Sequence, residues 1–313
     1  MNSDRRRSAT PEGRLPSDNV SSVAQTPKSL VSKLSKRGPH KVLRGDLALA
    51  GQPGVVYTPA EGFNLPAVAF AHDWLAGTTN YAATLEHLAS WGIVAAAPAT
   101  ERGPVPSHLG LAADLGTTLD ICTGVRLGPG RISVHPERLA FAGHGMGAGV
   151  AVLAAARTAR VQAVAALFPA PTAPSATVAA ARIDVPGLVI AGASDVDSLG
   201  SDALALADAW KGESLLRVVD KGSSAGLVEG RRLLGFLGVG GSERRTQHVT
   251  RAHVTGYLLH HLTGDKTYAP FADPDAHFPG THPAVRDETE NPLDPDDAAA
   301  HHAGVQIGQL LGR

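Results

Sequence analysis

The sequence predicts an α/β protein built on a single doubly wound, mostly parallel sheet. Apolar runs of strand length alternate with helical patterns along about 220 residues, which is typical of consecutive βα units. Runs such as residues 66–71 and 93–98 are continuously apolar, as expected of strands that are covered on both faces. Residues 139–156 join another such run to a helical segment through a glycine-rich turn. Together these observations favour one large domain.

The individual elements follow from hydrophobic period and turn residues. The predicted strands are apolar runs bounded by turn residues, at 42–50, 55–58, 66–71, 93–98, 139–142, 161–168, 187–191 and 215–219. The predicted helices are at 80–91, 109–125, the stretch after the glycine-rich turn up to 156, 201–210 and 246–262. Asn80 is the expected N-cap of the first of these helices.

Charge and composition divide the chain into three parts. We expect a disordered basic arm at 1–27, a folded domain at 28–270, and an extended Pro/Asp/His-rich tail at 271–313 with a short helix at 298–311. Residues 1–41 carry nine Lys or Arg against three acidic residues, a net charge of +6. No aromatic residue is interleaved with this basic charge, so nucleic-acid binding is not expected.

The remaining composition argues against a disulfide framework and a membrane span. Cys122 is the single cysteine, and its apolar surroundings predict a buried core residue. No apolar stretch approaches the roughly 18 residues that cross a bilayer. The arginines at 5–7 are not followed by the apolar segment of a signal peptide. We therefore expect a soluble, cytoplasmic protein.

The glycine-rich turn has the setting of a nucleophile elbow, in which Gly-x-Ser-x-Gly joins a strand to a helix. Here the five residues are Gly143, His144, Gly145, Met146 and Gly147. The nucleophile position is Gly145, which has no side chain. Covalent catalysis through this position is therefore excluded.

Four segments together resemble the α/β-hydrolase fold, and within it the dienelactone hydrolases and the bacterial cutinase-like polyester hydrolases. They are residues 66–77, 81–98, 139–149 and 185–195. The resemblance covers roughly residues 40–270 and implies a site made of a nucleophile, a histidine base, an acid that orients the base, and amide donors for an oxyanion.

By that resemblance the triad is incomplete. The acid position falls on Asp195, in a Gly-x-x-Asp turn, with Asp197 as the second choice. The base position falls on Ser224, and the nucleophile position on Gly145. The loss of both the nucleophile and the base favours natural degeneration over an engineered inactivation.

The implied oxyanion loop also departs from the family pattern. It contains His72, Asp73 and Trp74, with Asp73 where glycine is usual. A carboxylate near the oxyanion opposes its charge, by about 1–4 kcal/mol at about 4 Å. The backbone amides of Met146 and Trp74 are the expected donors.

The histidines are not expected to act in catalysis or metal binding. His144 is expected to pack beneath the elbow, and Ser223 and Ser224 have no histidine near them in the sequence to make them nucleophiles. The histidines of the last long helix lack the i, i+4 spacing of zinc ligands and are expected at or near the surface; they are His248, His253, His260 and His261.

The sequence thus predicts a catalytically inactive pseudohydrolase that needs no cofactor or metal. Its pocket would bind a hydrophobic or acyl small molecule or a protein partner. One alternative is a weak ester hydrolase in which Asp73, Asp195 or Asp197 activates a water. The other is an interaction scaffold that acts through its charged tails.

Overall fold

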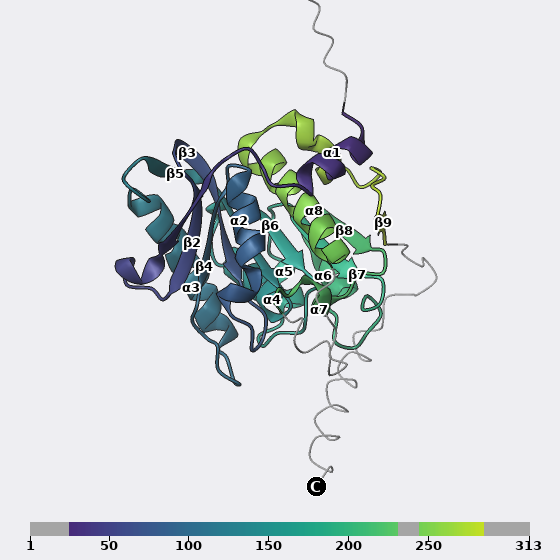
Figure 1. Ribbon diagram of the computed structural model, residues 1–313. Helices are drawn as coiled ribbons and strands as arrows, with labels where there is room; N and C mark the ends of the chain where they lie inside the picture. Colours follow the sequence, from purple (N-terminus) through teal and green to yellow (C-terminus); the bar gives the residue numbers. More distant parts are fainter. Residues whose placement is uncertain (1–24, 231–243, 285–313) are drawn as a thin grey trace, which may run out of the picture.

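The computed structural model describes residues 25–230 and 244–284. The predicted fold class is confirmed, because the described residues form an α/β structure around one mostly parallel sheet (Figure 1). The greater part of the basic arm and of the acidic tail, including the helix expected at 298–311, lies outside the described residues.

The sheet of the described part has nine strands in the order β1-β2-β4-β3-β5-β6-β7-β8-β9. Their bounds are β1 (Val42–Asp46), β2 (Gly54–Pro59), β3 (Gly62–Ala71), β4 (Val94–Pro98), β5 (Ile132–His144), β6 (Val161–Leu167), β7 (Gly187–Gly192), β8 (Ser214–Val219) and β9 (Thr281–Pro283). Strands β3 to β8 run parallel, whereas β1, β2 and β9 pair antiparallel with their neighbours.

Helices cover both faces of this sheet (Figure 1). They are α1 (Pro27–Leu34), α2 (Ala82–Ser90), α3 (His108–Gly124), α4 (Met146–Ala155), α5 (Ala176–Ala180), α6 (Ala203–Ala209), α7 (Ser224–Leu227) and α8 (Arg244–Thr263), with short 3₁₀ turns η1 (Leu47–Ala50), η2 (Thr78–Tyr81) and η5 (Lys266–Ala272). None of the helices in the described part is long and apolar enough to cross a membrane.

Two hydrophobic cores lie on opposite faces of the sheet, as the alternation of residues along β3 shows. Ala67 and Ala69 pack in one core with helices α3 to α6, and Val68 and Phe70 pack in the other with α1, α2 and α8. Both sides of this part of the strand are therefore buried, which explains why residues 66–71 of β3 are continuously apolar. Cys122 lies buried in the first of these cores, as predicted.

Several predicted boundaries differ from the structure. Strand β3 begins at Gly62 rather than at 66, β5 begins at Ile132 rather than at 139, and the N-cap of α2 is Tyr81 rather than Asn80. The strand expected at 42–50 ends at Asp46, because the Asp46 carboxylate accepts from the amide of Ala48 at 2.9 Å and starts η1. The sheet continues beyond residue 270, since β9 pairs with β8. That short strand lies in a proline-rich segment, which is why its sequence does not indicate a strand.

His253 is the one histidine of α8 whose predicted surface position is clearly wrong. It is 2% exposed and packs edge-on against the rings of Phe271 and Phe278, which stack on each other. Its Nδ1 lies 2.9 Å from the carbonyl of Val249, and its Nε2 lies 3.2 Å from Oγ1 of Thr281. Burial lowers the pKa of His253 to about 4.

This buried ring predicts a loss of stability in acid. His253 takes up a proton near pH 6.5 in the unfolded chain but only near pH 4 in the folded chain. Protonation of His253 therefore lowers the free energy of unfolding by about 3 kcal/mol as the pH falls from 6.5 to 4. In urea unfolding measured from pH 7 to pH 4, the free energy of unfolding should fall less steeply in His253→Gln than in the wild type. Thr281→Val keeps the titrating ring and should keep the steep fall; equal slopes in all three proteins would contradict the prediction.

Candidate functional site

The loops that follow β3, β5, β7 and β8 meet at the carboxyl edge of the parallel strands. Ligands of parallel α/β sheets bind at this edge, beyond the ends of the strands. A cavity of about 130 Å³ lies between these loops. Its lining residues, one or more from each loop, include Asp73, Gly145, Asp195 and Ser224.

The turn between β5 and α4 has the tight backbone expected of an elbow. Gly145 has φ 56° and ψ −120°, in the region that side-chain-bearing residues rarely adopt. The turn is also crowded from outside, since a Cβ on Gly147 would lie 2.3 Å from the carbonyl oxygen of Ala71. The glycines therefore let α4 begin directly against the end of β3.

The side chain of Asp73 occupies the space above Gly145. A Cβ built on Gly145 would lie 2.1 Å from Oδ1 and 2.3 Å from Cγ of Asp73. No side chain fits at position 145 unless this carboxylate moves away. The backbone conformation favours glycine at position 145, although nucleophile elbows hold a serine in such a turn, and the position of Asp73 leaves no room for any side chain there.

The same carboxylate receives both amides that the sequence indicated as oxyanion donors. Oδ1 of Asp73 accepts from the amide of Met146 at 2.9 Å and from the amide of Trp74 at 2.8 Å. Two backbone N–H groups that converge on one oxygen at this distance are the arrangement of an oxyanion hole. The protein's own carboxylate fills it, whereas the sequence predicted only a nearby opposing charge.

Neighbouring groups hold the Asp73 loop in place. The amide of Asp73 donates to the hydroxyl of Tyr81 at 3.1 Å. The ring of His72 is buried, with Nδ1 2.9 Å from the carbonyl oxygen of Asp73 and Nε2 2.8 Å from that of Thr100. His72 therefore ties the loop to the end of β4 and does not line the cavity.

His144 lies beneath the elbow, fully buried between the rings of Tyr81 and Phe168. Its Nδ1 lies 2.9 Å from the Tyr81 hydroxyl, and its Nε2 lies 3.1 Å from Oγ of Ser224. The expectation that no histidine supports Ser224 is therefore wrong. The two residues are 80 positions apart, and only the meeting of the β5 and β8 loops brings them together.

Asp195 rather than Asp197 lies at the cavity. Oδ2 of Asp195 accepts from the amide of Ser224 at 2.5 Å, and its Oδ1 accepts from Oγ of Ser194 at 3.0 Å. Asp197 is exposed and is not among the residues that line the cavity. The acid and base positions implied by the resemblance are thus neighbours, although the base position carries a serine.

Tyr81 is a site residue to which the sequence analysis gave no role. Its hydroxyl binds both the amide of Asp73, in the loop after β3, and Nδ1 of His144, in the elbow after β5. A signal existed in the sequence, since Tyr81 begins one of the four segments that carry the resemblance. Its partners lie on other strands, however, and the sequence alone does not identify them.

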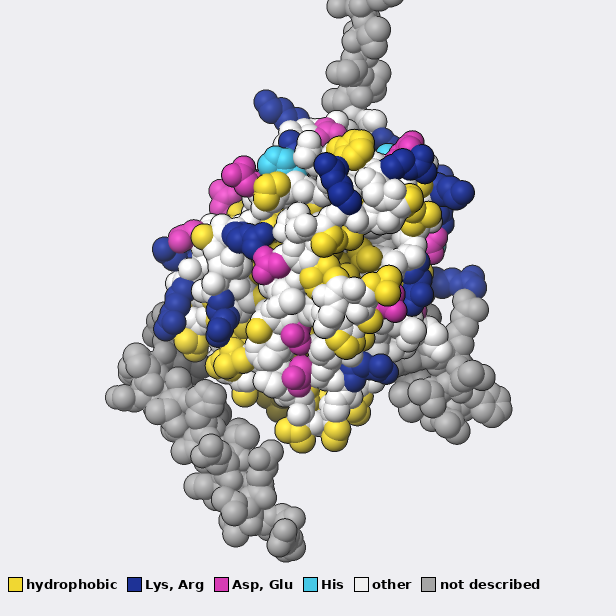
Figure 2. All heavy atoms as spheres, turned by 90° about the vertical axis from the view of Figure 1, so that its left-hand side faces the viewer, with side chains coloured by type: hydrophobic (Ala, Val, Ile, Leu, Met, Phe, Trp, Pro, Cys, Tyr) yellow, Lys and Arg dark blue, Asp and Glu magenta, His cyan; other side chains and the backbone are white. Residues whose placement is uncertain are grey.

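Exposed hydrophobic side chains follow β3 and β4 at the same edge of the sheet. Trp74 is 52% exposed, Leu75 is 57% exposed and Val105 is 91% exposed. The indole of Trp74 donates to the carbonyl of Pro104 at 3.1 Å, which joins the two loops. Figure 2 shows hydrophobic side chains at the lower end of the molecule.

The cavity offers acceptors and hydroxyls, and its described lining contains no Lys or Arg. Asp73 and Asp195 supply carboxylates, and Ser198, Ser201 and Ser224 supply hydroxyls. No group of three or more His, Cys, Asp or Glu in residues 25–230 and 244–284 is arranged to hold a metal ion. The site favours a ligand that donates hydrogen bonds.

The contact between Asp73 and position 145 predicts coupled effects on stability. Gly145→Ser should destabilise the protein by about 3 kcal/mol or more, because it strains the turn and displaces Asp73 from two amides. In the background of Asp73→Gly the same change should cost at least about 1 kcal/mol less. Chemical unfolding of the two single variants and the double variant measures this coupling.

Asp197→Gly is the matched control, because Asp197 is an exposed aspartate of the same region and lies outside the cavity. It should leave the cost of Gly145→Ser unchanged. If Asp73→Gly also leaves that cost unchanged, the carboxylate does not occupy the space above the elbow.

Comparison with known proteins identifies no relative of the chain from which a function could be inferred. Searches against protein-family models and against curated proteins give no match to the chain. The functional assignment therefore rests on the positions of Asp73, Gly145, His144, Asp195 and Ser224.

Proposed function

We propose that the chain is a catalytically inactive protein of the α/β-hydrolase fold whose pocket binds a small ligand. The observation that carries this proposal is the Asp73 carboxylate, which accepts from the amides of Met146 and Trp74. The order of the strands and the strained glycine turn after β5 support the resemblance to this fold. The remaining argument concerns what such a site is able to do.

Acyl transfer through this site lacks three of its requirements. Gly145 supplies no nucleophile, and Ser224 stands at the position of the base. The oxyanion hole normally stabilises the negative charge that develops on the substrate oxygen. Here a negatively charged oxygen of the protein already occupies it, so a second one is repelled.

The size and the lining of the cavity indicate the class of ligand. Its volume of about 130 Å³ is below the roughly 300–1,000 Å³ of drug-sized ligand sites, which gives little support to a long acyl chain inside it. Its carboxylates and serine hydroxyls suit a small group that donates hydrogen bonds. An apolar remainder of the ligand would contact the exposed Trp74 and Leu75 beside the cavity.

A second candidate is a hydrolase that uses Ser224 as its nucleophile. One observation favours it: Oγ of Ser224 lies 3.1 Å from Nε2 of His144, and the Tyr81 hydroxyl lies 2.9 Å from Nδ1. A nucleophile, a base and a group that orients the base are the parts of a catalytic triad. The paired amides of Trp74 and Met146, however, already donate to Asp73, so they do not offer this arrangement a free oxyanion hole.

Two other hypotheses receive less support: an ester hydrolase in which a carboxylate activates a water, and an interaction scaffold that acts through its charged tails. Oδ1 of Asp73 accepts two amides and Asp195 accepts two further hydrogen bonds, so these oxygens are already engaged by the protein and are not free to orient a water. The charged tails of the scaffold hypothesis lie mostly outside the described residues, and that hypothesis stays a prediction.

Rebuilding the triad tests the proposal. The wild type and Gly145→Ser should hydrolyse p-nitrophenyl butyrate no faster than the buffer does. The triple variant Asp73→Gly, Gly145→Ser, Ser224→His opens the hole, restores the nucleophile and places a base beside Asp195. Its rate of ester hydrolysis should exceed that of the wild type by about 10²-fold, which is at the lower end of what general-base catalysis contributes.

Two controls separate the candidate functions. Asp195→Asn in the triple background should lower the gained rate, because it removes the group that orients the new base. In the wild type, a fluorophosphonate probe should leave Ser224 unlabelled. Labelling of Ser224 that Ser224→Ala and Tyr81→Phe reduce, together with ester turnover by the wild type, would refute the inactive-protein proposal and favour the second candidate.

A further inference from the structure

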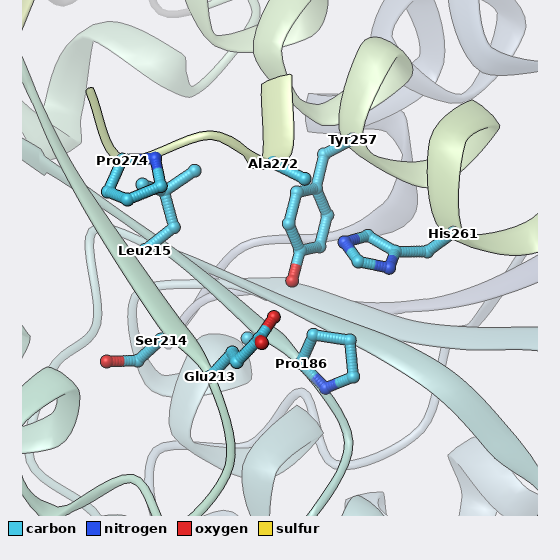
Figure 3. Close-up of a pocket in the computed structure, with 9 residues that line it drawn as sticks. Pro186, Glu213, Ser214, Leu215, Tyr257, His261, Ala272 and Pro274 are labelled. Atoms are coloured by element: carbon cyan, nitrogen blue, oxygen red, sulfur yellow. The ribbon is translucent and has the colours of Figure 1, made fainter. Parts of the chain in front are cut away.

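A second cavity lies at the opposite edge of the sheet, where β7 and β8 begin (Figure 3). Its volume is about 460 Å³, within the range of small-molecule sites. Tyr257 and His261 of α8 form one wall, and Glu213 and Leu215 lie across from them. Because the strands are parallel, this cavity is a full strand length from the candidate site and independent of the function proposed for it.

Two polar atoms of this wall are buried without a hydrogen-bond partner among the described residues. They are the hydroxyl of Tyr257, a residue that is only 2% exposed, and Nε2 of His261. The two rings are in contact, with centroids 4.4 Å apart and their planes tilted by 58°. Buried polar atoms normally have partners, so this pair indicates a missing one.

Glu213 gives the cavity a negative charge. In Figure 3 the Tyr257 hydroxyl points toward the Glu213 carboxylate. Burial, and then the charge of Glu213, raise the pKa of Tyr257 well above its usual value, so the hydroxyl stays neutral. Burial, and then the neighbouring His260, lower the pKa of His261 to about 4, so its ring is neutral near pH 7.

The positive charges nearby do not balance Glu213. None of the described lining residues is Lys or Arg. Arg217, further along β8, is not a lining residue; it lies over the ring of Phe278 and donates through Nη2 to the carbonyl of Asp273, while its Nε and Nη1 are buried without a partner among the described residues. An anionic ligand would therefore meet repulsion here, whereas a cation that donates hydrogen bonds would find a carboxylate and two neutral acceptors.

We propose that this cavity binds a small primary ammonium compound. The three N–H groups of an ammonium fit the carboxylate of Glu213, the hydroxyl oxygen of Tyr257 and Nε2 of His261. A short apolar body packs against Pro186, Leu215 and Ala272. The Tyr257 hydroxyl and His261 Nε2 are both shielded from solvent, so binding in this proposal includes a rotamer change of the exposed Glu213 side chain.

Titration of the full chain with n-butylammonium tests this proposal, followed by ¹H–¹⁵N NMR of α8 and of the His261 ring. n-Butanol and butanoate have the same carbon chain without the positive charge. Butylammonium should cause saturable shifts at Tyr257 and His261, and butanol should bind at least about tenfold more weakly, since a hydrogen bond to a charged group contributes about 1.5–3 kcal/mol.

Three variants locate the binding. Glu213→Gln should weaken butylammonium binding at least about tenfold, and Tyr257→Phe should weaken it without lowering the melting temperature, because it removes an unpartnered hydroxyl. Glu137→Gln, at an exposed glutamate of β5, should have no effect. The proposal is overturned by the absence of saturable shifts, by butanol or butanoate binding as tightly as butylammonium, or by Glu213→Gln binding like the wild type.

Discussion

The candidate site depends on one interaction, in which the Asp73 carboxylate accepts the amides of Trp74 and Met146. The two amides belong to the loop after β3 and to the first residue of α4, so a single side chain joins the oxyanion loop to the elbow. Hydrogen bonds from backbone amides to a carboxylate are roughly twice as strong as neutral ones. The interaction therefore stabilises the turn, and in the function we propose it occupies the position that a substrate oxyanion would take.

This interaction also explains why position 145 carries no side chain. A serine there would strain the turn and collide with Asp73, so the nucleophile and the carboxylate exclude each other. Neither substitution alone yields an open oxyanion site beside a serine: Gly145→Ser meets the carboxylate, and loss of Asp73 leaves two amides without their acceptor. His144, packed below between Tyr81 and Ser224, belongs to the same hydrogen-bonded structure.

The sequence was sufficient for the fold because its signals are local. Continuous apolar runs such as residues 66–71 of β3 and the glycine turn at Gly145 predict buried parallel strands and an elbow without reference to distant residues. The site was less predictable, because its contacts are not local. The direction of the Asp73 side chain, the approach of Ser224 to His144 and the burial of His253 each depend on loops that meet only after the sheet has formed.

Amide hydrogen exchange at Trp74 and Met146 tests the central claim most directly. If Asp73 accepts both amides, each should exchange slowly in the wild type and at least about tenfold faster in Asp73→Ala, as expected when a hydrogen bond to a charged group is lost. Asp197→Ala should change neither rate. Equal rates in the wild type and Asp73→Ala would contradict the claim that this carboxylate fills the hole.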